Sequence, residues 1–253
     1  MGRSVPLSQG EFEKWIGEVQ YIIFDCHISS RNLLKLVSRP PDGLEWREIS
    51  GFLDHLRTQY YFTLTTQLAK LFCDGRQDYR LQRLVARMRA SFTSPFIRKR
   101  LEANALDERK SILPYCWNDK AAMASGLDHL EDIIAQHDDL IQFLKRTRDN
   151  HIAHTSASSS PSEIAPSPQQ LTQLVALANQ VYTDLRSGLG MAHVSFDTDH
   201  SWNIDPVFAG WKKLVELHSL KRDLFRIHRG GKGPVFMECS NETGRIQIRA
   251  MEA

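Results

Sequence analysis

Hydrophobic residues recur at helical spacing along most of the chain. Apolar positions three and four residues apart give each segment one face that can pack on a core, which predicts helices rather than strands. Ser8, Ser94 and Ser167 stand where three of these helices begin, and a proline directly follows the second and third of these serines. Helices are expected at about 8–39, 45–72, 78–90, 94–108, 120–154 and 167–188, with Gly126 as a point of interruption.

The pattern changes after Gly190. One further amphipathic helix is expected at 206–228, and two short runs with strand character between 235 and 250 flank a turn, which is compatible with a β-hairpin. The sequence therefore predicts an all-α fold, an antiparallel helical bundle over residues 1–189. Residues 190–253 form a small C-terminal extension in this interpretation, with the helix and the hairpin.

Composition narrows the class of protein. Hydrophobic residues at 42% and charged residues at 25% are ordinary for a globular chain. The four cysteines are scattered without a C-x-x-C pair, which favours reduced thiols over a disulfide framework or a zinc site. No apolar run reaches the roughly 18 residues of a membrane helix, and the N-terminus has no signal-peptide pattern. We therefore expect a cytoplasmic protein that needs no membrane and no cofactor.

Polar residues interrupt the apolar face of one predicted helix at Arg-Asp-Asn-His-Ile-Ala-His, residues 148–154. On a helical wheel, Arg148, His151 and His154 lie on the side that carries Leu144. A guanidinium and two imidazoles in place of Leu or Ile cost free energy unless they are paired or line a cleft. This conflict between pattern and residue type marks the segment as the candidate functional site.

An imidazole and a guanidinium together suit phosphodiester cleavage without a metal. Histidine can take the proton of a ribose 2′-hydroxyl or protonate the leaving oxygen, and arginine can neutralise charge on the non-bridging oxygens. RNA carries that internal nucleophile and DNA does not, so RNA is the expected substrate. A metal site at His151 and His154 is disfavoured, because the wheel turns Asp149 away from the histidines and Arg148 would repel a cation.

Two other functions explain the same residues. A non-catalytic module that binds RNA or a nucleotide would use Arg148 without chemistry, and its biological effect would survive mutation of His154. An interaction protein would use the motif as a polar contact between helices and its C-terminal segment to bind a partner. In that protein, Arg148→Ala would reduce folding stability and change no RNA.

Basic residues gather on two consecutive predicted helices. Between Arg76 and Lys110, ten Arg and Lys residues stand against four acidic ones, although the net charge of the chain is only +2. Such an excess predicts a surface that contacts RNA phosphates, whereas the alternative is a solvated face that only aids solubility. The predicted RNA-binding residues are Arg80, Arg83, Arg87, Arg98, Lys99 and Arg100.

The Arg-Asp-x-x-Ile-Ala-His string resembles the motif of the HEPN superfamily, the helical domains of many prokaryotic toxin and abortive-infection proteins. The family's mark is an arginine, a polar residue, several others and a histidine on a late helix of an all-α bundle. With the long helices before it, the chain is most similar to the abortive-infection type U branch, and the resemblance covers residues 8–188 in layout.

The resemblance implies a metal-independent endoribonuclease that acts as a homodimer, together with an antitoxin or regulatory partner. Its interface is expected to include the face that carries Leu144 and the motif. The resemblance implies that Arg148 stabilises the phosphate charge, that His154 is the general acid or base, and that Asp149 orients or supports the site. The family pattern does not require His151, so we expect His151 to contribute less than His154.

Overall fold

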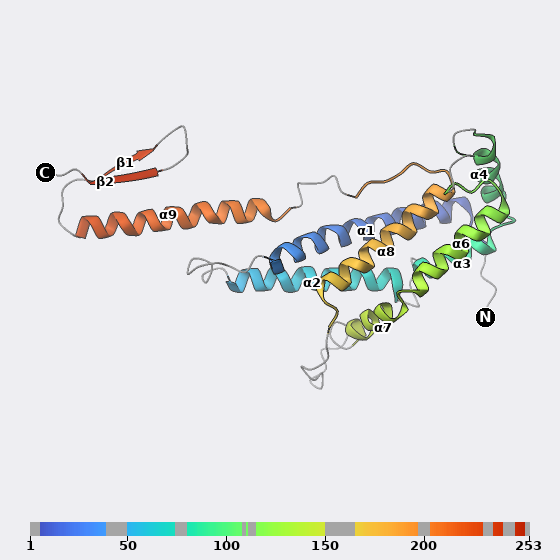
Figure 1. Cartoon of the computed structure of the whole chain (residues 1–253), viewed down its shortest axis with the longest axis horizontal. Helices are drawn as coiled ribbons and strands as arrows, with labels where there is room; N and C mark the ends of the chain where they lie inside the picture. The colour runs from blue at the N-terminus through green and yellow to red at the C-terminus, as the bar shows by residue number, and fades with distance from the viewer. Residues whose placement is uncertain are drawn as a thin grey trace. The chain divides into compact units, whose positions relative to one another are not determined.

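The computed structural model describes residues 6–38, 50–73, 80–107, 110, 115–149, 165–196, 203–229, 235–239 and 246–250. The chain divides into two compact units. The described residues up to 196 belong to the first unit, and those from 203 onward belong to the second. The regular elements described in the first unit are all helices (Figure 1).

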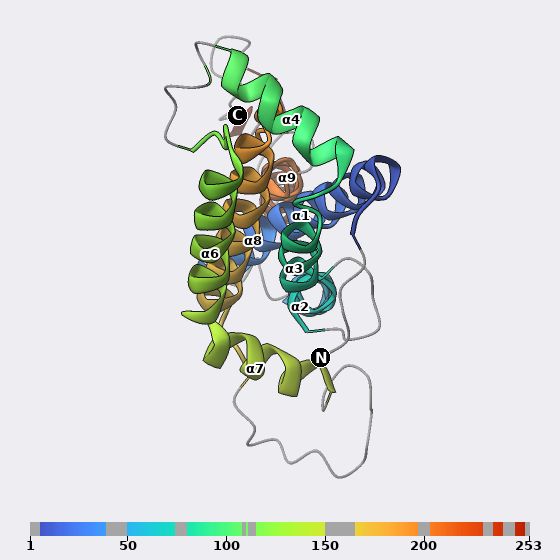
Figure 2. The same ribbon diagram turned by 90° about the vertical axis from the view of Figure 1, so that its right-hand side faces the viewer.

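The first unit is a helical bundle, which confirms the predicted all-α fold. Its long members α1 and α2 pack side by side, α8 packs on both of them, and α6 joins α8 to α3. Figure 2 views the bundle end-on. The helices are α1 (Gln9–Ser38), α2 (Ser50–Phe72), α3 (Leu81–Ala90), α4 (Pro95–Leu106), α6 (Lys120–Ala135), α7 (Asp138–Thr147) and α8 (Pro168–Gly188).

The core of this bundle follows from helical spacing. In α1, Phe12, Val19 and Ile23 are fully buried and lie seven and four residues apart, so one stripe of the helix faces inward. Leu68 of α2 and Tyr182 of α8 are buried in the same core. The Tyr182 hydroxyl donates a hydrogen bond to the side chain of Gln20 at 2.9 Å, so burial of its ring leaves no polar atom unsatisfied.

The single helix predicted at 120–154 is wrong, because it is broken between α6 and α7. His137 has non-helical torsions (φ −107°, ψ 11°), and its backbone N–H turns back to the carbonyl oxygen of Ile134 at 3.0 Å. Asp138 and Asp139 then open α7, where acidic groups favour a helix N-terminus. The predicted stretch 150–154 lies outside the described residues.

Gly126, expected to interrupt a helix, instead lies inside α6 and makes room for Trp117. A Cβ atom at Gly126 or at Gly188 of α8 would overlap the indole ring, which is 5% exposed. The Trp117 backbone N–H donates to the carbonyl oxygen of Gly188 at 2.8 Å, and buried Asn104 donates to the carbonyls of both residues. Two glycines and one asparagine therefore hold this ring between α6 and α8.

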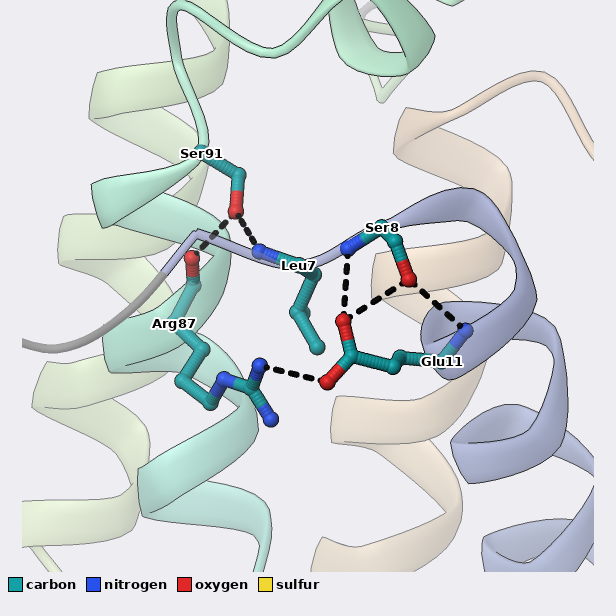
Figure 3. A network of polar contacts seen from close by, with 5 residues as sticks. All are labelled: Leu7, Ser8, Glu11, Arg87 and Ser91. Atoms are coloured by element: carbon teal, nitrogen blue, oxygen red, sulfur yellow. Dashed lines mark hydrogen bonds and ion pairs between the residues drawn. The ribbon is translucent and has the colours of Figure 1, made fainter.

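The start of α1 is tied to α3 by the polar network in Figure 3. Ser8 and Glu11 form a reciprocal cap, in which the Ser8 N–H donates to Glu11 at 2.9 Å and the Glu11 N–H donates to the Ser8 hydroxyl at 3.3 Å. Arg87 of α3 donates to the other oxygen of Glu11 at 3.1 Å. The Leu7 N–H donates to the Ser91 hydroxyl at 2.7 Å, so both helices share one polar junction.

We expect this junction to make the protein sensitive to acid. Hydrogen bonds from the backbone and side chain of Ser8, followed by the one from Arg87, lower the pKa of Glu11 from 4.5 to about 2. A lowered folded-state pKa stabilises the fold above the ordinary pKa, and this contribution is lost as the pH falls from 4.5 toward 2. Glu11→Gln should therefore lower the melting temperature at neutral pH and flatten its decline across this range.

Melting curves recorded by circular dichroism between pH 7 and pH 2 would measure this effect. Glu18→Gln is a matched control, because Glu18 is an exposed glutamate on the same helix. An acid limb of the Glu11→Gln protein that runs parallel to the wild-type limb would contradict the assignment.

The second unit contains α9 (Asp205–Arg229) and the strands β1 (Val235–Cys239) and β2 (Ile246–Ala250). The strands pair antiparallel, with Val235 opposite Ala250 and Cys239 opposite Ile246. Both strands lie next to α9. None of the helices that the structure describes is long and apolar enough to cross a membrane.

Candidate functional site

α7 carries the first residue of the candidate motif on its buried side. Ile141, Leu144 and Thr147 are buried at three-residue intervals, and Arg148 follows Leu144 by four positions on the same side. The Arg148 side chain is nonetheless 22% exposed, so its guanidinium reaches from an apolar helix face to the surface. The outward face of α7 carries the exposed residues Gln142 and Arg146, and Lys145, at the edge of that face, is exposed as well.

Asp149 holds the guanidinium of Arg148 in one orientation. The Arg148 Nε–H and an Nη2–H both donate to Asp149 Oδ1, at 2.8 Å and 2.6 Å. Such a charge-assisted pair offsets part of the cost of placing a charge on the apolar side of a helix. The wheel turns Asp149 outward, but regular α-helical geometry ends at Thr147 and residues 148–149 form a wider π turn.

The remaining residues of the motif lie outside the described part of the chain. These include His151 and His154, so their roles stay predictions. Within the described ranges, no three His, Cys, Asp or Glu residues come together as a metal site. Leu144 is fully buried within its own chain, so its side chain is not available to a partner, and the dimer interface on the face that carries the motif stays a prediction.

The end of α2 and the start of α3 lie beside α7. The Cys73 thiol, directly after α2, donates to the carbonyl oxygen of Ile141 at 3.6 Å. Gln82 in the first turn of α3 donates to the carbonyl oxygen of Phe72 at 3.5 Å. These two contacts place the beginning of α3 and Ile141, in the first turn of α7, at the same end of α2.

Four charged side chains act on the Cys73 thiol. Burial raises the pKa of Cys73 to about 11, while Arg148, Lys145 and Arg80 act to lower that pKa and Asp149 acts to raise it. Sequence reasoning assigned no role to Lys145 or Cys73. Lys145 precedes Arg148 by one helical turn, so its spacing could have identified it. No sequence signal identifies Cys73, because its position depends on how α2 packs.

The structure separates the basic residues of α3. Arg80 immediately precedes α3, whose start lies at the end of α2, and its charge acts on the same Cys73 thiol as that of Arg148. Arg87 instead binds Glu11, and its guanidinium stands 5.4 Å above the Trp15 ring. Its side chain is 13% exposed, so charge reversal at Arg87 would disturb the fold as well as any RNA contact. Arg83, between them in sequence, is exposed.

The basic residues of α4 are not brought to the motif within one chain. Figures 1 and 2 place α4 and α7 at different ends of the first unit. Arg98 forms an ion pair with Glu102 at 3.6 Å, Arg100 lies 5.9 Å from the Phe96 ring centre, and Lys99 is exposed. Of the six predicted RNA-binding residues, Arg80 is the one whose charge acts on the same thiol as Arg148 and Asp149.

Comparison with known families gives a match. The family model HEPN_AbiU2, described as AbiU2, matches residues 22–204, which include most of α1 and all the later helices of the first unit. No curated protein and no solved structure was found to match the chain. The match confirms the resemblance drawn from residues 148–154. The chain therefore belongs to the HEPN_AbiU2 family and is a HEPN-type abortive-infection module.

Proposed function

We propose that the chain is a metal-independent endoribonuclease. The observation that carries this proposal is the guanidinium of Arg148, which leaves the buried side of α7, is oriented by Asp149 and remains partly exposed. A cation fixed in this way is suited to stabilise the charge that develops on a phosphate during cleavage. The resemblance at residues 148–154 implies a histidine at the end of the same motif, which is His154.

The proposed reaction is attack of a ribose 2′-oxygen on the adjacent phosphorus. The new P–O2′ bond forms as the P–O5′ bond breaks, which leaves a 2′,3′-cyclic phosphate and a free 5′-hydroxyl. One imidazole takes the proton of the 2′-hydroxyl, and another donates a proton to the departing 5′-oxygen. Arg148 neutralises charge on the non-bridging oxygens with paired N–H donors. The reaction is balanced without an oxidant or a metal ion.

A homodimer is part of this proposal. Two copies of the motif that face each other across a two-fold axis would supply two imidazoles and two guanidinium groups to one phosphate. One histidine could then serve as the base while the other serves as the acid. The abortive-infection family also suggests a toxin–antitoxin partner, which would keep such an activity in check until it is needed.

Cleavage should persist in EDTA and should require the 2′-hydroxyl. We expect products that end in a 2′,3′-cyclic phosphate or a 3′-phosphate, and no product from an RNA that carries 2′-deoxyribose at the cleaved position. Denaturing gels of end-labelled RNA and analysis of the 3′ ends would test this. Activity that disappears with chelator and returns with Mg²⁺ or Mn²⁺ would overturn the mechanism. RNA binding with no cleavage would favour a non-catalytic module.

A further inference from the structure

Among the described residues, three basic side chains and one acidic group lie near the end of α2. Arg80, Lys145 and Arg148 all act on the Cys73 thiol, and so does Asp149. The contacts from Cys73 to α7 and from α3 to the end of α2 hold these elements together. Three cations against one carboxylate leave an excess of two positive charges. Like charges held close together repel, and partial burial increases the cost.

Arg80, which precedes α3, has no counter-ion among the described residues, unlike Arg87 and Arg89 of that helix. Arg87 pairs with Glu11 at 3.1 Å, and Arg89 reaches Asp128 at 2.7 Å and Glu131 at 3.0 Å. The Nε–H of Arg80, in contrast, is buried and has no hydrogen-bond partner among the described residues. A buried donor without a partner costs free energy in the unliganded protein, so it is a feature that binding of an anion would remedy.

The backbone fixes where this donor stands. Arg80 immediately precedes α3 in an extended conformation (φ −65°, ψ 127°), and its carbonyl oxygen accepts the first hydrogen bond of the helix, from the Leu84 N–H at 2.9 Å. Its Cα is therefore held at the start of α3, which lies next to the end of α2, and its charge acts on the Cys73 thiol there. A guanidinium positioned in this way can bind a phosphate without much reordering of the backbone.

We propose that Arg80, flanked by Lys145, binds a phosphate of the RNA next to the phosphate that Arg148 contacts. The inference rests on the proposed function, because it takes RNA as the source of the anion. Arg80 is a substrate-binding residue here and does not touch the reacting atoms. It holds the RNA backbone so that one particular linkage lies at the motif, which makes it a determinant of binding rather than of chemistry.

A purely structural role for Arg80 and an anion site predict opposite changes in the melting temperature of Arg80→Gln. The last carbonyl groups of α2 carry partial negative charge, and a nearby arginine could serve only to balance it. In that case Arg80→Gln would lower the melting temperature. An anion site predicts that the melting temperature of Arg80→Gln is unchanged or higher, because the substitution removes one of three mutually repelling cations.

The test is RNA binding to the full chain as a function of salt, measured by fluorescence anisotropy. The probe is a single-stranded RNA with 2′-O-methyl groups throughout, which cannot be cleaved by attack of the 2′-oxygen. Loss of one phosphate contact should reduce the slope of log K against log salt by about 0.7 for a single strand. We expect Arg80→Gln to show this reduction, with affinity about tenfold weaker at low salt. Arg80→Lys, which keeps the charge, should retain the slope.

Arg146→Gln is the matched control, because Arg146 is an exposed arginine on the outward face of α7 with its guanidinium 5.8 Å from the Phe143 ring centre. For Arg146→Gln, the slope of log K against log salt should lie closer to the wild-type slope than the slope for Arg80→Gln does. Equal slopes and affinities for wild type and Arg80→Gln would overturn the inference, as would absence of RNA binding by wild type. A lower melting temperature or failure of Arg80→Gln to fold would also overturn it, in favour of the structural role.

The inference and the proposed function fail in distinguishable ways. If wild type cleaves unmodified RNA while Arg80→Gln binds the probe with wild-type affinity and slope, the nuclease is supported and the phosphate site is refuted. If Arg80→Gln loses one phosphate contact while wild type cleaves no RNA, the site stands and the chain is a binding module.

Discussion

Arg148→Ala is expected to abolish RNA cleavage while the helical bundle remains folded. The substitution removes the donors that are poised to stabilise phosphate charge, and loss of such a group costs about 10²–10³ in rate. Arg148→Lys should not restore activity, because an ammonium cannot supply the planar pair of donors that now binds Asp149 Oδ1. We expect His154→Ala to be comparably impaired and His151→Ala to be less so.

Initial rates on labelled RNA, together with melting curves of each variant, would measure this prediction. Arg146→Ala is the control from the same helix, because Arg146 lies on the outward face and is exposed. Full activity of Arg148→Ala would contradict the role given to the motif. A fall in melting temperature with no effect on any RNA would instead identify the motif as a structural contact and the chain as an interaction protein.

The second large effect is expected at the Trp117 ring. A methyl group at Gly126 would overlap the indole, which cannot move aside because Gly188 of α8 contacts its other side. Overpacking of this kind costs about 1–3 kcal/mol, which outweighs the gain of roughly 1 kcal/mol from replacing a helical glycine with alanine. We therefore expect Gly126→Ala to reduce the free energy of unfolding, and Trp117→Ala to reduce it by about 3–5 kcal/mol.

A double-mutant cycle would show that the two effects share one cause. In a Trp117→Ala background the obstructing ring is absent, so Gly126→Ala should be neutral or stabilising there. Gly17→Ala is the control, because no atom of another part of the chain lies within 4 Å of a Cβ at that helical position. Urea unfolding followed by circular dichroism would give the free energies. An equal cost of Gly126→Ala in both backgrounds would refute the packing explanation.

Local signals in the sequence predicted where several helices begin. Ser8 with Glu11, and Ser167 with Gln170, form reciprocal capping boxes at the expected positions. Such signals are reliable because both partners lie within one turn of each other. Ser94 also precedes a helix that opens with proline, but its side chain makes no capping hydrogen bond.

Features that depend on distant residues could not be predicted in this way. Spacing placed Arg87 on a basic face of α3, but its partner Glu11 lies 76 residues earlier in the chain. In the same way, Gly126 was expected to interrupt a helix, because the sequence does not show that its missing side chain leaves space for the Trp117 ring. The break at His137 has no proline or glycine to announce it.

At the candidate site, too, local features could be predicted from the sequence and contacts between distant residues could not. Helical periodicity correctly placed Arg148 on the buried side of α7, since Leu144 precedes it by four residues on that side. Periodicity did not predict the contact between Arg148 and Asp149, because α-helical geometry ends at Thr147 and the long arginine side chain folds back onto its neighbour. The approach of Cys73 and Arg80 to the motif required the packing of three helices, which a wheel for one helix cannot represent.

Because α7 is short, the candidate site depends on a local folding equilibrium of this one helix. A helix of 10 residues is marginal in water by itself, so α7 exists because Ile141, Leu144 and Thr147 are buried against the rest of the bundle. The break at His137 also ends its hydrogen-bonded continuity with α6. Detaching α7 therefore requires less free energy than unfolding the whole bundle. In the proposed function, detachment of this one helix would move Arg148 away from the phosphate and so abolish cleavage.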